Sequence, residues 1–181
     1  RTTTKTRVLV HKQQIARIDD ETDEALLEEE LVSLNDRVQD LIPRVDTVVL
    51  SDYAKGCLSK DLLASIISTA RSHNKMVLVD PKSRDLSKYS GATMITPNLA
   101  EALNAAGIEN GGEADSDEAA GRILSRTSID SLLITLGEHG MKLFETGKNP
   151  THFPSMARQV FDVTGAGDTV VALLAAALGA G

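Results

Sequence analysis

The sequence predicts an α/β fold, a three-layer α/β/α sandwich whose mostly parallel sheet is covered by helices on both faces. Short apolar runs of the buried-strand type alternate with segments of helical periodicity, and strands joined through helices pair in parallel with right-handed crossovers. Most of these runs are followed by glycines or carboxylates. The chain has 181 residues, of which 41% are hydrophobic, and this is enough apolar material for one domain with a core.

The first part of the chain combines a basic segment with an acidic helix. Residues 4–18 have the Thr, Val and Ile content of one or two strands, and residues 1–17 carry five basic side chains and no acid. From Asp23 onward the apolar residues follow a helical period, and Pro43 ends that helix. The basic segment is open to two interpretations, a solvated face or a surface that binds an anion.

Four apolar runs and the helices between them form the centre of the predicted fold. The expected strands cover residues 46–50, 76–79, 93–96 and 131–136. We expect one helix after an N-cap at Ser59 and two more over residues 98–106 and 115–127. After Gly137 the pattern is typical of antiparallel strands at a sheet edge, at residues 141–144, 152–153 and 160–161. The apolar stretch 170–178 is interpreted as a buried helix.

Composition and charge exclude several kinds of partner. A formal net charge of −7, with 3% aromatic residues and no Trp, does not fit a nucleic-acid partner. The longest apolar run, residues 170–178, is shorter than the roughly 20 residues that a membrane span needs, so we expect no membrane partner. The single cysteine, Cys57, excludes an internal disulfide, and we expect a cytoplasmic protein in which Cys57 is a small buried residue.

The strongest local pattern is the segment 162–168, which directly precedes the apolar helix. Gly165, Ala166 and Gly167 allow a tight turn that brings N–H groups to a helix N-terminus, where an anion such as phosphate is favoured. Asp168 at the mouth of that helix can take a proton from a hydroxyl whose oxygen then attacks phosphorus. The alternative is that Asp168 only caps the helix.

A second pair of polar residues lies at the start of the predicted helix 98–106. Asn98 and Glu101 are three residues apart and therefore project on the same side of its first turn. Glu101 there can bind Mg²⁺, directly or through water, beside nucleotide phosphates. The two residues also fit a capping box, with Asn98 as N-cap and Glu101 at the third helical position, and both interpretations remain open.

These patterns together resemble the ribokinase-like carbohydrate kinase family, also called the phosphofructokinase-B family. Residues 162–168 match the family signature D-T-x-G-A-G-D, with Val163 where Thr is common. The remaining matches, in the family's order, are Asn98 and Glu101 for N-x-x-E, Thr135, Gly137 and Gly140 for T-x-G-x-x-G, and residues 51–56 for S-D-Y-x-K-G. The resemblance implies a ribokinase-like fold and phosphorylation of a sugar by ATP with Mg²⁺.

Within that family the chain resembles the heptose 7-phosphate kinases. The similarity lies in residues 3–9, in Gln13 and Gln14 with Arg17 and Asp19, and in residues 79–82 and 91–98. It implies that ATP phosphorylates the anomeric hydroxyl of D-glycero-D-manno-heptose 7-phosphate, a step toward ADP-heptose and the lipopolysaccharide core. The alternatives are another sugar kinase of the family, such as a ribokinase or fructokinase, and a nucleotide-binding fragment without catalysis.

The resemblance also assigns roles to individual residues. Asp168 is the expected base, and residues 165–167 are the anion hole. Asn98, Leu99, Ala100 and Glu101 are placed at the ATP phosphates, with Glu101 at the metal, and Thr135, Gly137 and Gly140 line the nucleotide site. Lys82 either approaches the phosphates or is a surface lysine in a turn. Lys5 and Arg7 are candidates to bind the sugar phosphate, and Asp52 and Lys55 to shape the loop that faces the substrate.

The chain departs from the family pattern at both ends. The Gly-rich sugar-binding segment that family members carry is not present before Arg1, and the helices expected after Gly181 are missing. We therefore expect residues 1–181 to be a partial kinase domain, with substrate-side strands over residues 1–20 and a nucleotide-binding part over residues 21–181. This chain alone is expected to be inactive. A fused adenylyltransferase domain and a homodimer are the macromolecular partners considered.

Overall fold

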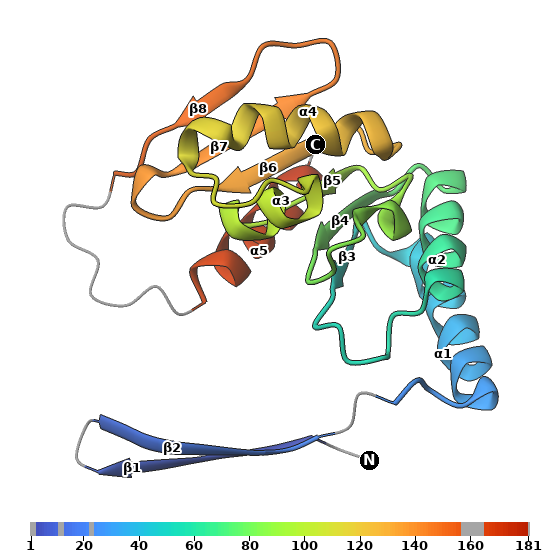
Figure 1. The fold of residues 1–181 in the computed structure, drawn as a ribbon. Helices are drawn as coiled ribbons and strands as arrows, with labels where there is room; N and C mark the ends of the chain where they lie inside the picture. The colour runs from blue at the N-terminus through green and yellow to red at the C-terminus, as the bar shows by residue number, and fades with distance from the viewer. Residues whose placement is uncertain (1–2, 11–12, 22–23, 157–164, 181) are drawn as a thin grey trace.

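The computed structural model describes residues 3–10, 13–21, 24–156 and 165–180, and its elements follow one another as Figure 1 shows. The strands are β1 (Thr4–Val10), β2 (Gln13–Asp20), β3 (Thr47–Ser51), β4 (Met76–Asp80), β5 (Met94–Ile95), β6 (Ser131–Thr135), β7 (Met141–Glu145) and β8 (Thr151–Phe153). The helices are α1 (Glu28–Leu41), α2 (Lys60–Ser72), α3 (Leu99–Ala106), α4 (Ser116–Arg126) and α5 (Ala166–Ala180). Short 3₁₀ helices are η1 (Ile42–Arg44), η2 (Leu86–Tyr89), η3 (Glu113–Asp115) and η4 (Gly137–His139).

A six-stranded sheet in the order β3-β4-β5-β6-β7-β8 forms the centre of the molecule. Strands β3 to β6 pair in parallel, whereas β7 and β8 are antiparallel at one edge. The predicted parallel sheet and its antiparallel edge are therefore confirmed. The third expected edge strand, residues 160–161, lies outside the described residues.

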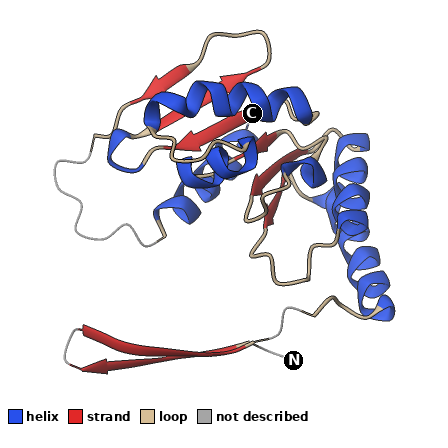
Figure 2. Ribbon diagram, in the orientation of Figure 1, coloured by secondary structure: helices blue, strands red, loops and turns tan. Residues whose placement is uncertain are grey.

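Helices cover both faces of this sheet (Figures 1 and 2). Alternate strand residues such as Val77, Val79 and Ile95 are buried in one core, which also contains the inner faces of α2, α3 and α4. Their neighbours, such as Leu78, belong to a second core into which Val170, Leu174 and Leu178 of α5 pack. Burial on both faces is what parallel strands require, and it confirms the predicted three layers.

The strands β1 and β2 form a separate antiparallel hairpin. They pair only with each other among the described residues, and every residue of both is exposed. Figure 1 shows the hairpin lying apart from the sheet. Ion pairs from Glu21, directly after β2, to Lys5 (2.6 Å) and to Lys55 in the loop after β3 (2.7 Å) connect the hairpin to the main sheet.

Two expectations from the sequence were wrong. The helix predicted from Asp23 onward begins at Glu28, with residues 24–27 outside it, because the Glu30 side chain accepts a hydrogen bond from the Leu27 N–H and caps the helix there. Cys57 is exposed, because it lies in the loop that leaves the sheet between β3 and α2 instead of packing beneath it. Among the described residues, no helix has the length and apolarity to cross a membrane.

The turn between β6 and β7 depends on a glycine with a left-handed backbone. Gly140 has a φ of +93°, and its carbonyl oxygen accepts a hydrogen bond from the Leu136 N–H at 2.8 Å. A Cβ at this position would lie 2.0 Å from the carbonyl oxygen of Phe153 in β8. Backbone strain and a clash with backbone therefore both oppose any side chain at residue 140.

We expect Gly140→Ala to lower the free energy of unfolding by about 3 kcal/mol or more, because strain and the clash act together. Gly147→Ala is the matched control, because Gly147 also has a positive φ, of +78°, but a Cβ there meets no atom within 4 Å. The control should lose only about 1–2 kcal/mol, the cost of the left-handed backbone alone. Urea unfolding of the complete gene product measures both, and equal losses would contradict the clash.

Candidate functional site

A cleft of about 180 Å³ opens at the carboxyl ends of the parallel strands, where open α/β sheets bind their ligands. The ends of β4, β5 and β6, the start of α3 and the N-terminus of α5 all contribute to it. Its lining residues are Asp80, Lys82, Thr96, Asn98, Glu101, Thr135, Gly165, Gly167, Asp168 and Val170. The fold thus brings together seven of the residues singled out from the sequence: Lys82, Asn98, Glu101, Thr135, Gly165, Gly167 and Asp168.

Asn98 and Glu101 form the capping box that the sequence allowed. The Glu101 N–H donates to Asn98 Oδ1 at 2.9 Å, and the Asn98 N–H donates to Glu101 Oε2 at 3.0 Å. The other carboxylate oxygen of Glu101 accepts from Lys82 Nζ at 2.6 Å, and this bond raises the pKa of Lys82. The capping role does not exclude a ligand role, because Oε1 of Glu101 faces the cleft side chain Lys82 and not the helix.

Asp80 is a cleft residue that was not selected from the sequence. Burial raises the pKa of Asp80, and the nearby carboxylates of Glu101 and Asp168 raise it further, while Lys82 lowers it. Three carboxylates and one ammonium therefore share the cleft. The signal that could have identified Asp80 is its position directly after the apolar run 76–79, at the carboxyl end of a parallel strand.

The N-terminus of α5 forms one wall of the cleft. Gly165 has a φ of +76°, and its carbonyl oxygen accepts hydrogen bonds from the backbone N–H and the hydroxyl of Thr169, both at 2.9 Å. The turn at Gly165 thus leads directly into the helix, and Asp168 lies in its first turn. The rest of the predicted motif, residues 162–164, lies outside the described residues.

Five further predicted nucleotide or anion-hole residues do not line this cleft: Leu99, Ala100, Ala166, Gly137 and Gly140. Leu99 and Ala100 are in the first turn of α3, and Ala166 is the first residue of α5. Gly137 and Gly140 shape the turn around η4, directly after Thr135 at the end of β6. All five residues are therefore neighbours of cleft residues along the chain and do not line the cleft themselves.

The four predicted substrate-side residues, Lys5, Arg7, Asp52 and Lys55, are not among those that line the cleft. Lys5 on the hairpin pairs with Asp19 (3.2 Å) and Glu21 (2.6 Å), and Lys55 pairs with Glu21. Arg7 lies directly opposite Arg17 in the hairpin register, and no ion pair to Arg7 is found in the described part of the chain.

Asp52 follows β3 directly and has only 5% of its surface exposed. Its carboxylate accepts from Tyr89 Oη (2.5 Å), Lys88 Nζ (2.6 Å) and the Ala54 N–H (2.7 Å). Burial would raise the pKa of Asp52, but these bonds outweigh it and hold that pKa below its ordinary value. Both carboxylate oxygens are therefore occupied by protein groups.

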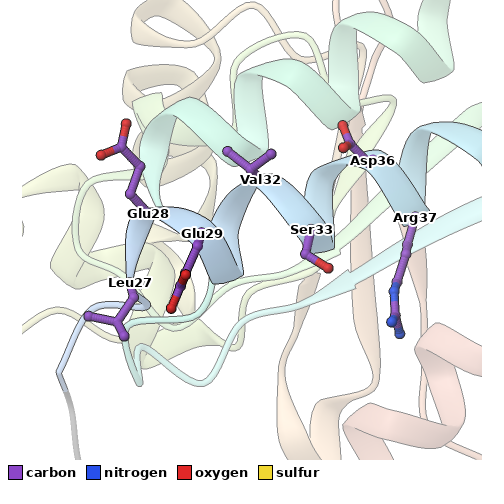
Figure 3. Close-up of a pocket in the computed structure, with 7 residues that line it drawn as sticks. All are labelled: Leu27, Glu28, Glu29, Val32, Ser33, Asp36 and Arg37. Atoms are coloured by element: carbon purple, nitrogen blue, oxygen red, sulfur yellow. The ribbon is translucent and has the colours of Figure 1, made fainter.

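A larger hollow lies along α1, where its lining residues come from one helix and the residue before it (Figure 3). The side chains drawn there point away from the helix on both of its sides. Three of them are acidic, Glu28, Glu29 and Asp36, and one is basic, Arg37. No residue with predicted chemistry is among them. The cleft at the carboxyl ends of the strands is therefore the candidate functional site.

The donor set of the cleft fits a magnesium ion that arrives with phosphates. Carboxylate oxygens are the ligands Mg²⁺ prefers, and it is commonly held by one or two of them together with substrate phosphates. Within the described ranges no group of three or more His, Cys, Asp or Glu side chains is arranged to hold a metal by itself. A divalent ion would also balance the excess of carboxylates over the single lysine.

Comparison with known proteins agrees with this fold. The chain is 49% identical over 184 residues to the "Bifunctional protein HldE" of Trichlorobacter lovleyi, covering 100% of this chain and 37% of that relative. Its fold matches Arabidopsis thaliana ribokinase complexed with ribose and ATP, with a TM-score of 0.68 and 19% identity over 93% of this chain and 53% of the other. It also matches Escherichia coli phosphofructokinase-2, with a TM-score of 0.74 and 20% identity over 91% and 54% of the two chains.

The family model for the pfkB family carbohydrate kinases matches residues 1–181. The chain spans about 37% of the length of curated relatives such as the Trichlorobacter lovleyi protein. A family match along the whole sequence, together with a fold shared with ribokinase and phosphofructokinase-2, makes this chain a member of the pfkB family of carbohydrate kinases.

Proposed function

We propose that the protein transfers the γ-phosphoryl group of ATP to the anomeric hydroxyl of D-glycero-D-manno-heptose 7-phosphate. The product would be the 1,7-bisphosphate, on the route to ADP-heptose and the lipopolysaccharide core. The observation that carries the proposal is the 49% identity to an HldE protein along the whole chain. The cleft supports it, because it places a carboxylate, a lysine and a helix N-terminus together as phosphoryl transfer requires.

In the proposed mechanism Asp168 is the general base. It accepts the proton of the sugar hydroxyl, the oxygen forms a bond to the γ-phosphorus, and the bond from that phosphorus to the leaving ADP breaks. N–H groups of residues 165–167 at the N-terminus of α5 stabilise the negative charge on the transferred group. Lys82 contributes a positive charge to the same cleft, where it pairs with Glu101.

Glu101 would hold Mg²⁺ together with the nucleotide phosphates, and the ion would neutralise their charge when bound. The carboxylate is suited to this because the capping box fixes its Oε2, while its Oε1 accepts from the exposed ammonium group of Lys82. Asp80 adds a second carboxylate to the same wall. Thr135, with Gly137 and Gly140 in the following turn, would lie along the nucleotide.

The hairpin is the proposed contact for the phosphate that the substrate already carries. Arg7 and Arg17 lie opposite each other in register, and like charges at such positions repel unless an anion lies between or beside them. Arg17 is partly balanced by Asp19 at 2.8 Å. Arg7 is therefore the stronger candidate of the two predicted cations, because Lys5 already has two carboxylate partners.

We expect Asp168→Asn to lower kcat by about 10²–10⁴-fold, because a positioned base is lost while the shape of the side chain is kept. Steady-state kinetics of the complete gene product with heptose 7-phosphate measure this loss. Asp61→Asn is the matched control, because Asp61 is also an exposed carboxylate in the first turn of a helix, α2. Retained turnover in Asp168→Asn would contradict its assignment as the base, whereas ATP binding without any turnover by the wild-type protein would favour a nucleotide-binding module over a kinase.

Glu101→Gln separates the capping role from the metal role. Glutamine also fits the third position of a capping box, so the thermal stability should change little. The free Mg²⁺ concentration for half-maximal rate should rise about tenfold or more, because a charged ligand of the ion is lost. An unchanged Mg²⁺ dependence would contradict the assignment of Glu101 to the metal.

Arg7→Ala tests which sugar is the substrate. The KM for heptose 7-phosphate should rise about 10- to 100-fold, the size of a lost hydrogen bond between charged groups. The KM for an unphosphorylated sugar, measured with the same variant, is the internal control and should not change. If Arg7→Ala left the KM unchanged for both substrates, a ribokinase- or fructokinase-like specificity would be favoured instead.

Relatives whose name includes the word bifunctional also support the proposal that the complete gene product is longer than this chain. Because this chain covers about 37% of the Trichlorobacter lovleyi relative, we propose a fused adenylyltransferase domain in the complete gene product. That domain would act on the product of the kinase after removal of one phosphate. The sequence of the gene on both sides of this segment tests the proposal directly.

A further inference from the structure

The η4 turn, residues 136–140 between β6 and β7, receives a hydrogen bond from a side chain of the edge strand β8. His152 Nε2 lies 2.9 Å from the carbonyl oxygen of His139, the last residue of η4. A carbonyl oxygen only accepts, so Nε2 of His152 carries a proton and donates it. Packing contributes little to holding this part of the turn, because the side chains of Glu138 and His139 are 86% and 57% exposed. The bond from His152 is therefore a specific restraint on the backbone of the turn.

The restrained peptide group is the one that joins His139 to Gly140. Its carbonyl oxygen accepts from His152, and its N–H donates to the carbonyl oxygen of Gly137 at 3.1 Å. Gly140 has a φ of +93° in this orientation. The opposite orientation of the peptide group would give Gly140 a negative φ, which glycine adopts about as readily. The two hydrogen bonds therefore select the observed orientation, because the conformational preference of glycine does not.

The η4 turn continues directly from the cleft. Thr135, the last residue of β6, lines the cleft, and its N–H donates to the carbonyl oxygen of Pro97 at 3.1 Å. Gly137 and Gly140, in the turn that follows, are the residues proposed above to lie along the nucleotide. The strand β8 also meets this turn through its backbone, since a Cβ on Gly140 would lie 2.0 Å from the carbonyl oxygen of Phe153. The turn is thus supported by two consecutive residues of β8.

We propose that His152 is a positioning residue that fixes the peptide group between His139 and Gly140, and with it the shape of the turn along the nucleotide. The proposal rests on the proposed kinase function. His152 is not among the residues that line the cleft, so it acts through the η4 turn and not on the reacting atoms. Lys142, which lies opposite His152 in the strand register, forms an ion pair with Asp117 of α4. The strand pair that carries His152 is therefore itself connected to the helical layer.

Two substitutions of His152 test this role in the complete gene product. His152→Leu removes the donor, whereas His152→Gln keeps an N–H donor at a similar reach. We expect His152→Leu to raise the KM for ATP about tenfold, the effect of one lost hydrogen bond, with kcat and the KM for the sugar phosphate unchanged. His152→Gln should restore most of the affinity for ATP. Thr151→Val is the matched control, because Thr151 is an exposed neighbour in the same strand whose side chain points to the opposite face.

Hydrogen exchange at the Gly140 amide gives a measurement that does not depend on catalysis. This amide should exchange faster in His152→Leu, but not in His152→Gln or Thr151→Val, because its bond to the Gly137 carbonyl opens when the peptide group rotates. Unchanged exchange in His152→Leu would overturn the proposal. So would an unchanged KM for ATP, an equal rise for the Leu and Gln variants, or an equal rise for both substrates.

Calorimetric binding of a non-hydrolysable ATP analogue with Mg²⁺ separates this proposal from the kinase assignment. If the wild-type protein phosphorylates no sugar, the proposed function fails. Analogue binding that is weakened by His152→Leu and not by His152→Gln would still support the positioning role. Analogue binding that is the same in the wild-type protein and in His152→Leu would overturn that role, whatever the sugar substrate is.

Discussion

Burial of apolar side chains on both faces of β4 to β6 is the constraint on which the rest of the structure depends. Val77 and Val79 face one helical layer and Leu78 faces the other, so the strand can exist only between two layers of helix. Parallel strands between two layers must end at the same edge of the sheet. The segments that follow them, which carry Asp80, Asn98 and Thr135, are brought together for this reason.

At that edge, residues that cap or begin helices also line the cleft. Glu101 caps α3 through one oxygen and contacts Lys82 through the other. The turn at Gly165 begins α5 and aims the helix N-terminus at the same cleft. Three carboxylates held near one lysine leave an excess of negative charge, and the raised pKa of Asp80 reflects that repulsion together with its burial. A cleft of this kind is suited to phosphate only together with a cation.

Hydrogen bonds also connect the loops that follow β3 and β4. Asp52, directly after β3, accepts a hydrogen bond from the hydroxyl of Tyr89 in a 3₁₀ helix 37 residues further on, and its N–H donates to the carbonyl oxygen of Asp80 at the end of β4. The loops at the sheet edge are thus tied to one another as well as to their own strands. The described residues of the hairpin of β1 and β2 are all exposed, and ion pairs through Glu21 connect it to the loop after β3.

The sequence by itself determined the features that depend on residues a few positions apart. These include the strand runs, the N-caps Ser59 and Asn98, and the glycine turns, and the motif order also indicated the family. Only the tertiary structure decided that Asp80 shares the cleft, that Lys82 pairs with Glu101 and that Cys57 is exposed. The physical reason is that burial and charge pairing depend on segments distant along the chain, which meet only when the sheet has formed.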